Sequence, residues 1–337
     1  MLNNQDFTQD RSQYLGGSDI GALLGVSKYR TALDVWLEKT RRQIKQIDSL
    51  AIRFGQFAEA FVAEEYIRET GYQLRHHTNP VIHPEYSFMV GHIDRFVFRG
   101  DSDSQAPLFN QDGSCRADHL LEIKTASAYH QSDWGELGTD EVPMTYLVQC
   151  LWYLAMTNLD HAELAVLFGN HDFRIYQIER DLELEGLILD KAKTFWEVHV
   201  QNDCPPPPQN EADCHQLFSH ERIGKRIEAP AHLAALPQKI HRLQEEIKVR
   251  EDEISQMKQA IMETMQDAET LSYGGRVLAT WKTPKPSQRL DTKRLSQEHP
   301  KLVQKYQVSI ALSRRLLIKC ATKEAPGKKP LGLADIQ

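Results

Sequence analysis

The sequence predicts an α/β fold, a sheet covered by helices, followed by a C-terminal section of different character. Helical spacing of apolar residues alternates with runs of strand-forming residues over residues 1–203, as in sheets with helical cover. The segment "CPPPPQNEAD" then interrupts the pattern, because each proline fixes φ and removes a backbone donor. Beyond it, residues 231–270 follow a heptad pattern.

Composition is that of an ordinary globular protein, with 337 residues, 41% hydrophobic and 26% charged. This length suits one large domain with appendages. Apolar runs fall short of the roughly 18 residues of a membrane helix, and "MLNNQDFTQDRSQY" lacks the apolar centre of a signal peptide. We therefore expect a cytoplasmic protein with no membrane partner.

The cysteines do not form a metal-binding or disulfide pattern. There are five, widely scattered and without a CxxC pair, which supports neither a zinc ribbon nor a disulfide framework. An iron–sulfur cluster would need four grouped thiolates. Reduced structural cysteines are the better interpretation of Cys115, Cys150, Cys204, Cys214 and Cys320.

The first elements are predicted to be helices. "GGSDIGALLG" is typical of a glycine turn followed by a helix start, with Ser18 as the N-cap, and "SKYRTALDVWLEKT" continues helically. Residues 51–70 carry apolar side chains at helical spacing, so we expect an amphipathic helix that Gly71 ends.

Strands and helices then alternate. Extended segments are predicted in "YQLRHHTNPVIH", "FMVGHIDRFVF" and "HLLEIKT", and a helix in "MTYLVQCLWYLAMTN". "AELAVLFGN" and "FRIYQIERD" are expected to form a hairpin, and "LELEGLILDKAKTFWEVHVQN" a closing helix. The order is helix, three strands, helix, two strands, helix.

The C-terminal section divides into three parts. Residues 204–230 are predicted to be a proline-rich connector. Residues 231–270 are predicted to be one long helix whose apolar seam Arg250 interrupts; the seam would pack on a copy of itself, on another helix of this chain, or across the body. Residues 271–337 should form a hairpin around Gly274–Gly275, a helical stretch and a strand over "VSIALSRRLLIK".

Charge is unevenly distributed along the chain. The net charge is −7, but residues 271–337 carry 14 Lys and Arg against 4 Asp and Glu, which leaves −17 on the first 270 residues. A basic section beside an acidic body suits a protein that contacts phosphates in one place and binds cations in another, and it also suits a merely soluble surface.

Acidic residues interrupt two otherwise apolar runs. Asp94 lies in "VGHIDRFVF", and Glu122 and Lys124 lie in "LLEIKT", where alternation puts them on one strand face. A buried carboxylate there needs a partner, a hydrogen-bond cage or a metal. Glu59, within the amphipathic helix, is either an ordinary solvated glutamate or a third member of the cluster.

Acids on two neighbouring strands and a covering helix would form a hard oxygen-ligand site. Such a site suits Mg²⁺, which keeps several waters and takes few carboxylates, with the backbone carbonyl of Ile123 as a further ligand. Lys124 would then sit beside a water activated by the metal. Gln149 and Tyr153 share one helix face and are either part of this site or ordinary core residues.

Five motifs stand within the first 203 residues, in the order "RSQYLGGS", "GQFAE", "GHIDRFV", "LLEIKT" and "QCLWY". Together they resemble the motifs of the lambda exonuclease and YqaJ viral recombinase group, phage-type alkaline exonucleases within the PD-(D/E)xK nucleases. The matching text arrives in family order over roughly residues 10–200; one departure is "GHIDR" where the family often has "PDG" or "PDR". The C-terminal "ATWKTPKPSQRLDTKRL" and "LSRRLLIK" are similar to the extension of longer members.

The resemblance implies a restriction-endonuclease-like nuclease core over residues 1–203, with a central mixed sheet flanked by helices. In that family's pattern Asp94 and Glu122 bind Mg²⁺, Glu59 supports a second metal or its waters, and Lys124 aligns the attacking water. Gln149 would steady Lys124 or the DNA, supported by Tyr153. Arg11 and Ser18 match the family's pocket for a DNA 5′-phosphate, although Ser18 also fits an ordinary N-cap.

The function expected from the resemblance is a Mg²⁺-dependent exonuclease, with Mn²⁺ as a possible substitute ion, that digests duplex ends 5′ to 3′. It would release 5′-mononucleotides and leave 3′ single strands for an annealing protein, as a homotrimer. Two alternatives are a structure-specific or single-strand endonuclease with the same core, and a non-catalytic DNA-binding adaptor. Intact Asp94, Glu122 and Lys124 argue against the adaptor.

Overall fold

The computed structural model describes residues 10–43, 49–100, 106–308 and 313–319. The chain divides into two compact units, Met1–Leu217 and Phe218–Gln337. The first unit contains the three-stranded and five-stranded sheets and every residue that the sequence suggests for the site. No helix in the described part of the chain is both long and apolar enough to cross a membrane.

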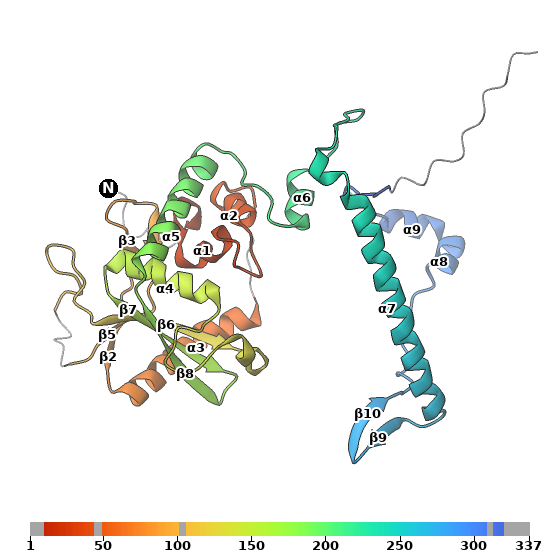
Figure 1. The fold of residues 1–337 in the computed structure, drawn as a ribbon, viewed down its shortest axis with the longest axis horizontal. Helices are drawn as coiled ribbons and strands as arrows, with labels where there is room; N and C mark the ends of the chain where they lie inside the picture. The colour runs from red at the N-terminus through yellow and green to blue at the C-terminus, as the bar shows by residue number, and fades with distance from the viewer. Residues whose placement is uncertain (1–9, 44–48, 101–105, 309–312, 320–337) are drawn as a thin grey trace, which may run out of the picture. The chain divides into compact units, whose positions relative to one another are not determined.

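A five-stranded mixed sheet forms the centre of the first unit (Figure 1). Its strand order is β2-β5-β6-β7-β8, with β6 and β7 parallel and the other neighbours antiparallel. The strands are β2 Gln73–Arg75, β5 Arg95–Phe98, β6 His119–Ala126, β7 His161–Phe168 and β8 Asp172–Glu179.

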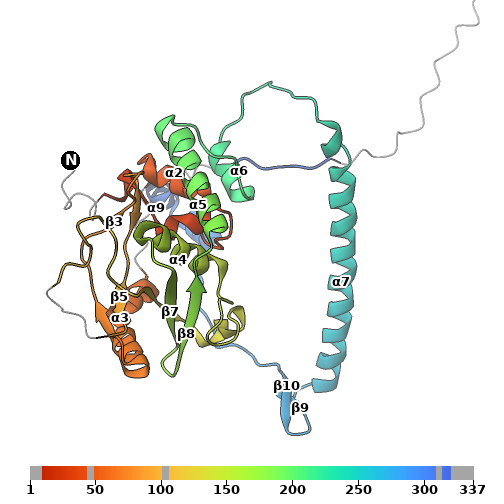
Figure 2. The same ribbon diagram turned by 60° about the vertical axis from the view of Figure 1, so that its left-hand side comes forward.

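Helices cover both faces of this sheet, because successive apolar residues of its strands point to opposite faces. Leu120, Leu164 and Val166 pack under helix α4, Met144–Thr157, in the larger core. Leu121 and Ile123 pack with Val62 and Tyr66 of helix α3, Leu50–Thr70, on the other face. Figures 1 and 2 show α4 and α3 on opposite sides of β6 and β7. The predicted α/β fold, a mixed sheet between helices, is confirmed.

The N-terminal segment lies on the α4 side of the sheet. The polypeptide enters through a 3₁₀ turn, Arg11–Gln13, before strand β1, Leu15–Gly16, and helices α1, Gly17–Leu23, and α2, Ala32–Lys39. Strand β1 pairs in parallel with β4, Met89–Gly91, which also pairs with β3, Val81–Ile82, in a second sheet. The continuous helix predicted through "SKYRTALDVWLEKT" is wrong, because α2 begins only at Ala32 with Thr31 as its N-cap.

The run "FMVGHIDRFVF" is not one strand. Strand β4 ends at Gly91 in the three-stranded sheet, and β5 begins at Arg95 in the five-stranded sheet. Asp94 therefore lies at the step between the two sheets rather than within a strand. Both halves are apolar because each is buried, so residue type alone conceals the break.

The first unit closes with a helix and the beginning of the predicted connector. Helix α5, Leu182–Thr194, continues as a π-helix through Phe195–Gln201. Within the predicted connector, helix α6, Glu211–Leu217, packs on the core: Thr31 Oγ1 donates to Asp213 Oδ1 over 3.0 Å, and the Ala32 amide to Gln209 Oε1 over 2.9 Å. The compact unit thus extends beyond residue 203 to Leu217.

The second unit is built on one long helix. Helix α7 spans Leu236–Met265 and follows a short 3₁₀ turn at Ala231–Leu233. Strands β9, Thr270–Tyr273, and β10, Arg276–Thr280, form the predicted hairpin, followed by helices α8, Thr292–Glu298, and α9, Pro300–Tyr306. The strand predicted over 308–319 falls partly outside the described residues, and 313–319 has no regular structure, which corrects that prediction.

Candidate active site

Asp94 and Glu122 lie side by side. Arg95 pairs with Leu121 across β5 and β6, which places the preceding Asp94 next to Glu122. The Ile123 amide donates to Asp94 Oδ2 over 2.8 Å, so the backbone of β6 fixes the position of this carboxylate. Two acids separated by 27 residues in sequence thus meet at the step between the sheets.

Glu122 is buried beneath α4 with two nitrogen donors on one of its oxygens. Lys124 Nζ contacts Glu122 Oε1, and Gln149 Nε2 donates to the same oxygen over 2.6 Å. The other oxygen, Oε2, is buried and has no hydrogen-bond partner among the described residues. A buried carboxylate oxygen without a donor is costly, so this position favours a cation.

The pKa values of these groups reflect the burial of neighbouring like charges. Burial raises the pKa of Glu122 to about 8, and the charge of Asp94 adds to this effect. Burial also raises the pKa of Asp94. Burial acts to lower the pKa of Lys124, but the charges of Glu122 and Asp94 outweigh it and raise that pKa, so the amine stays protonated.

Glu59 and Arg95 form the outer edge of the cluster. Arg95 Nη1 donates to Glu59 Oε1 over 2.7 Å and also contacts the Asp94 carbonyl. Glu59 is close enough to Asp94 that its charge contributes to the raised pKa of Asp94. Sequence reasoning missed Arg95, although a cation directly after a buried aspartate was a signal.

Gln149 and Tyr153 connect the acids to the N-terminal segment. Both are buried on one face of α4, and Gln149 Nε2 also lies 2.9 Å from Tyr153 Oη. Helix α1 approaches so closely that a Cβ on Gly17 would lie 2.8 Å from the Tyr153 ring and 3.0 Å from Gln149 Cγ. Only glycine allows this approach, so α1 and α4 are interlocked beside Glu122.

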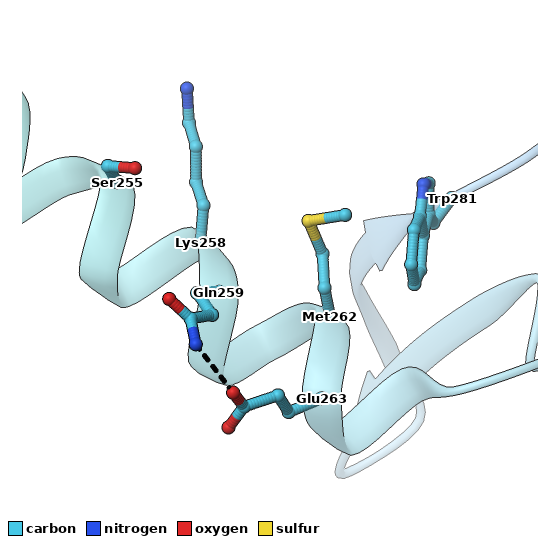
Figure 3. Close-up of a pocket in the computed structure, with 6 residues that line it drawn as sticks. All are labelled: Ser255, Lys258, Gln259, Met262, Glu263 and Trp281. Atoms are coloured by element: carbon cyan, nitrogen blue, oxygen red, sulfur yellow. Dashed lines mark hydrogen bonds between the residues drawn. The ribbon is translucent and has the colours of Figure 1, made fainter.

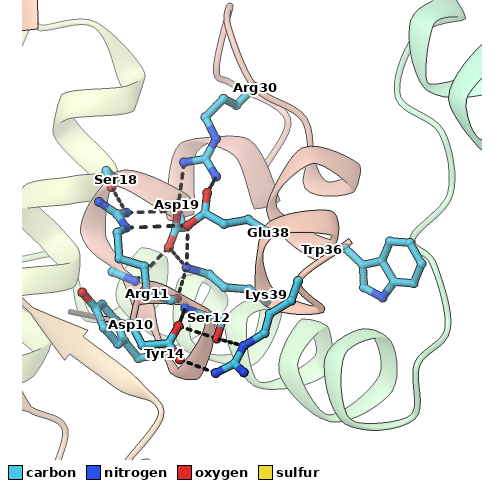
Figure 4. A network of polar contacts seen from close by, with 12 residues as sticks. Asp10, Arg11, Ser12, Tyr14, Ser18, Asp19, Arg30, Trp36, Glu38 and Lys39 are labelled. Carbon is cyan, nitrogen blue, oxygen red and sulfur yellow. Dashed lines mark hydrogen bonds and ion pairs between the residues drawn. The ribbon is translucent and has the colours of Figure 1, made fainter. Parts of the chain in front are cut away.

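Arg11 and Ser18 are brought together as expected. Arg11 Nη2 donates to Ser18 Oγ over 3.0 Å, and the Arg11 side chain is half exposed (Figure 4). Ser18 is not the N-cap, which is a correction: α1 begins at Gly17, Gly16 is the N-cap, and its amide is bound by Asp19. The Ser18 hydroxyl therefore takes no part in capping and lies beside Arg11.

A buried ion network holds Arg11 in place (Figure 4). Asp19 is fully buried and contacts Lys39 Nζ at 2.9 Å, Arg30 Nη1 at 3.0 Å and Arg11 Nη2 at 3.6 Å. Lys39 Nζ also donates to the Arg11 carbonyl over 2.8 Å. Burial acts to raise the pKa of Asp19, but Lys39, Arg11 and Arg30 reverse this effect and lower it. Sequence reasoning missed Asp19, although an aspartate in the apolar "DIGALL" was the same signal as Asp94.

Another group of metal-ligand types lies elsewhere on the sheet. His119, His161 and Glu163 have ligand atoms within 4.8 Å of one another, near the start of β6 and β7. The two imidazoles stack at 4.6 Å with planes 21° apart, and Tyr66 Oη bonds both His119 Nε2 and Glu163 Oε2. Tyr66 thus already occupies one ligand atom of His119 and one of Glu163, which suits a hydrogen-bonded core.

The donors at Asp94 and Glu122 do fit a hard divalent cation. Two adjacent carboxylates, one with an unpartnered buried oxygen, supply the oxygen ligands that Mg²⁺ prefers. An amide nitrogen and an ammonium fix the other Glu122 oxygen, leaving Oε2 available.

A known protein family matches the part of the chain that contains the candidate site. Residues 6–160 match the profile of the YqaJ-like viral recombinase domain. These residues are a YqaJ-like viral recombinase domain. The resemblance drawn from the sequence motifs is thereby confirmed, and the domain contains every predicted site residue, from Arg11 to Tyr153.

The domain and its flanking segments have relatives of known sequence or structure. The chain is 28% identical over 313 residues to the uncharacterized protein YqaJ of Bacillus subtilis (strain 168), covering 90% of this chain and 91% of that protein. It is 15% identical to an alkaline exonuclease of Laribacter hongkongensis, with TM-score 0.44, covering 59% of this chain and 94% of that one. A phage-related exonuclease of Haemophilus somnus 129PT is 13% identical, with TM-score 0.41 and coverages of 56% and 95%.

Proposed function

We propose that the protein is a metal-dependent DNA exonuclease that digests one strand of a duplex from its 5′ end. It would release 5′-mononucleotides and leave a 3′ single strand for an annealing protein. The observation that carries this proposal is the pair of adjacent carboxylates, Asp94 and Glu122, with an ammonium alongside and one buried oxygen unpartnered. A viral recombinase domain over the same residues supports DNA as the substrate.

Asp94 and Glu122, with the Ile123 carbonyl, are the residues that would hold Mg²⁺, and Glu59 would support a second ion or its waters. Bound there, the ion supplies Lewis acidity toward the phosphoryl oxygens and toward the attacking water. Gln149 keeps Glu122 in place by donating to Oε1. Tyr153, 2.9 Å from the Gln149 amide, limits how that amide can rotate.

Lys124 acts in its protonated form. The charges of Glu122 and Asp94 raise the pKa of Lys124, which favours the protonated amine. The ammonium instead orients the attacking water and offsets the negative charge that gathers on the phosphoryl oxygens in the transition state. The scissile phosphate would therefore lie on the Lys124 side of Glu122.

Arg11 and Ser18 would bind the terminal 5′-phosphate. A guanidinium and a hydroxyl 3.0 Å apart offer several donors to one phosphate. Asp19 contacts the Arg11 guanidinium and Lys39 donates to the Arg11 carbonyl, so the position of Arg11 is set before DNA binds. The contact of Gly17 with Tyr153 fixes the distance between this pocket and Glu122, which favours cleavage next to a 5′ end. A homotrimeric assembly and an annealing partner are further parts of this proposal, taken from the family resemblance.

Lys124→Ala tests the catalytic assignment. Degradation of a linear duplex in Mg²⁺ should fall about 100-fold or more, as when a transition-state donor is lost, while DNA binding survives. Lys28→Ala, which removes an exposed lysine of the same unit, is the matched control. Unaltered cleavage by Lys124→Ala would contradict the mechanism.

Chelator should stop wild-type cleavage, and degradation of a covalently closed circle would favour an endonuclease instead.

Arg11→Ala tests the phosphate pocket. On duplexes with and without a 5′-phosphate, the wild type should degrade the phosphorylated end faster, and the variant should degrade both at about the same rate. The reason is loss of the charge-assisted contacts to the terminal phosphate. Arg68→Ala, an exposed arginine paired with Glu65 on α3, controls for general loss of positive charge. A preference that persists in Arg11→Ala would place the end-binding pocket elsewhere.

A further inference from the structure

The face of α7 that carries the heptad seam is apolar and exposed. The four residues at the first core position, a, are all isoleucines, and each of the last three is at least 41% exposed. The helix runs for 30 residues, enough for four heptads and about 45 Å in length. The a positions are Ile240, Ile247, Ile254 and Ile261.

The second core position, d, differs in chemistry from the first. Leu236, Leu243 and Met257 occupy it, together with Arg250. β-Branched residues at a with leucine at d favour parallel two-stranded coiled coils, whereas isoleucine at both positions favours higher assemblies. The side chains of Leu236, Leu243 and Met257 are also exposed.

The hairpin of the second unit leaves this seam free. Trp281, just beyond β10, faces a shallow hollow on α7 lined by residues at b, c, e and f positions, none at a or d (Figure 3). Trp281 therefore packs on another side of the helix. The helical residues of the hollow are Ser255, Lys258, Gln259, Met262 and Glu263.

Charges beside the seam would meet charges of a second copy of the same helix. In a parallel pair each g position faces the partner's following e position, which sets Glu253 against Lys258 of the second copy. Glu246 would face Glu251, but both flank the layer of Arg250, whose charge offsets theirs. Arg250 already bonds Glu253 of its own helix at 2.8 Å. A single charged core layer compensated at its edges is a device that fixes register.

We propose that α7 pairs with α7 of a second copy of this chain in a parallel, in-register, two-stranded coiled coil. The isoleucines pack in the a layers, leucine and methionine in the d layers, and Arg250 sets the register. This pairing does not depend on the nuclease assignment. The pairing of α7 dimerises the chain independently of any further assembly that the first unit makes.

Sedimentation equilibrium of the full chain tests the pairing. Ile247→Glu together with Ile254→Glu places charges in two core layers and should halve the assembly mass relative to wild type. The matched control moves both glutamates by one residue, to Lys248→Glu and Ser255→Glu on the exposed b positions, and should keep the wild-type mass. An unchanged mass in the core variant would overturn the proposal. A mass one third of the wild-type value would overturn the two-stranded pairing and indicate a three-stranded coiled coil instead.

Disulfide capture tests orientation without relying on disruption. In the full chain with Cys204→Ser, Cys214→Ser and Cys320→Ser, Ile240→Cys should form an interchain disulfide in most molecules on mild oxidation. The neighbouring b position, His241→Cys, should give little. An antiparallel pair would hold the two copies of position 240 far apart, so no capture at Ile240→Cys, or equal capture at both positions, would overturn the parallel arrangement.

Discussion

Buried charge is the residue-level signal on which the site depends. Asp94, Glu122 and Lys124 were predictable because charged side chains interrupt apolar runs, and the structure brings all three together. Asp19 carries the same signal and was missed, because its partners Lys39 and Arg30 lie outside its own segment. Local sequence thus reveals a buried charge but not the groups that compensate it.

The raised pKa of Glu122 predicts how stability depends on pH. An unfolded glutamate ionises near 4.5 and the folded one near 8, so the metal-free protein should lose stability as pH rises between those values. The Glu122→Gln variant should lack the part of this stability loss that comes from ionisation of Glu122. Mg²⁺ binds the ionised carboxylate, so it should raise the melting temperature more at pH 8.5 than at pH 5.

Calorimetry with chelator or with Mg²⁺, on wild type and Glu122→Gln, measures these effects. The increase in melting temperature that Mg²⁺ causes should vanish in Glu122→Gln. A Mg²⁺ increment of equal size in both proteins, or one independent of pH, would show that the ion binds elsewhere.

At the scale of elements, periodicity predicted most helices and the β7–β8 hairpin but not the division into two sheets. The strands β4 and β5 are continuous in residue type, and only pairing partners distinguish them. The predicted N-cap at Ser18 was also wrong. Gly16 takes that place because Asp19, three residues on, binds its amide, a contact that leaves the Ser18 hydroxyl for Arg11.

Gly17→Ala tests the interlocking of α1 and α4. The added methyl would overlap the Tyr153 ring, so we expect a loss of about 1–3 kcal/mol in unfolding free energy and at least a tenfold slower nuclease rate. Gly186→Ala is the matched control, since a Cβ there meets open space on α5 and should be neutral or stabilising by about 0.5–1 kcal/mol. Urea unfolding and DNA degradation measure both quantities. Full activity in Gly17→Ala would show that α1 need not approach Glu122.

At the scale of the molecule, the change of pattern after residue 203 was visible in the sequence, but the end of the first unit was not. Gln209 and Asp213 bond the start of α2 across more than 170 residues, and no local pattern announces such contacts. The heptads of α7 were visible because they are local, and so was the +10 balance of residues 271–337. Features that arise within one element were predictable, whereas contacts between distant elements required the structure.

The central claim is that Asp94 and Glu122 share one divalent ion. Anomalous diffraction from crystals of the full chain soaked in Mn²⁺ tests it most directly. We expect one strong peak within coordination distance of Glu122 Oε2 and an Asp94 carboxylate oxygen, lost in crystals of Glu122→Gln. A map without density between these two side chains, with the carboxylates turned apart, would contradict the account.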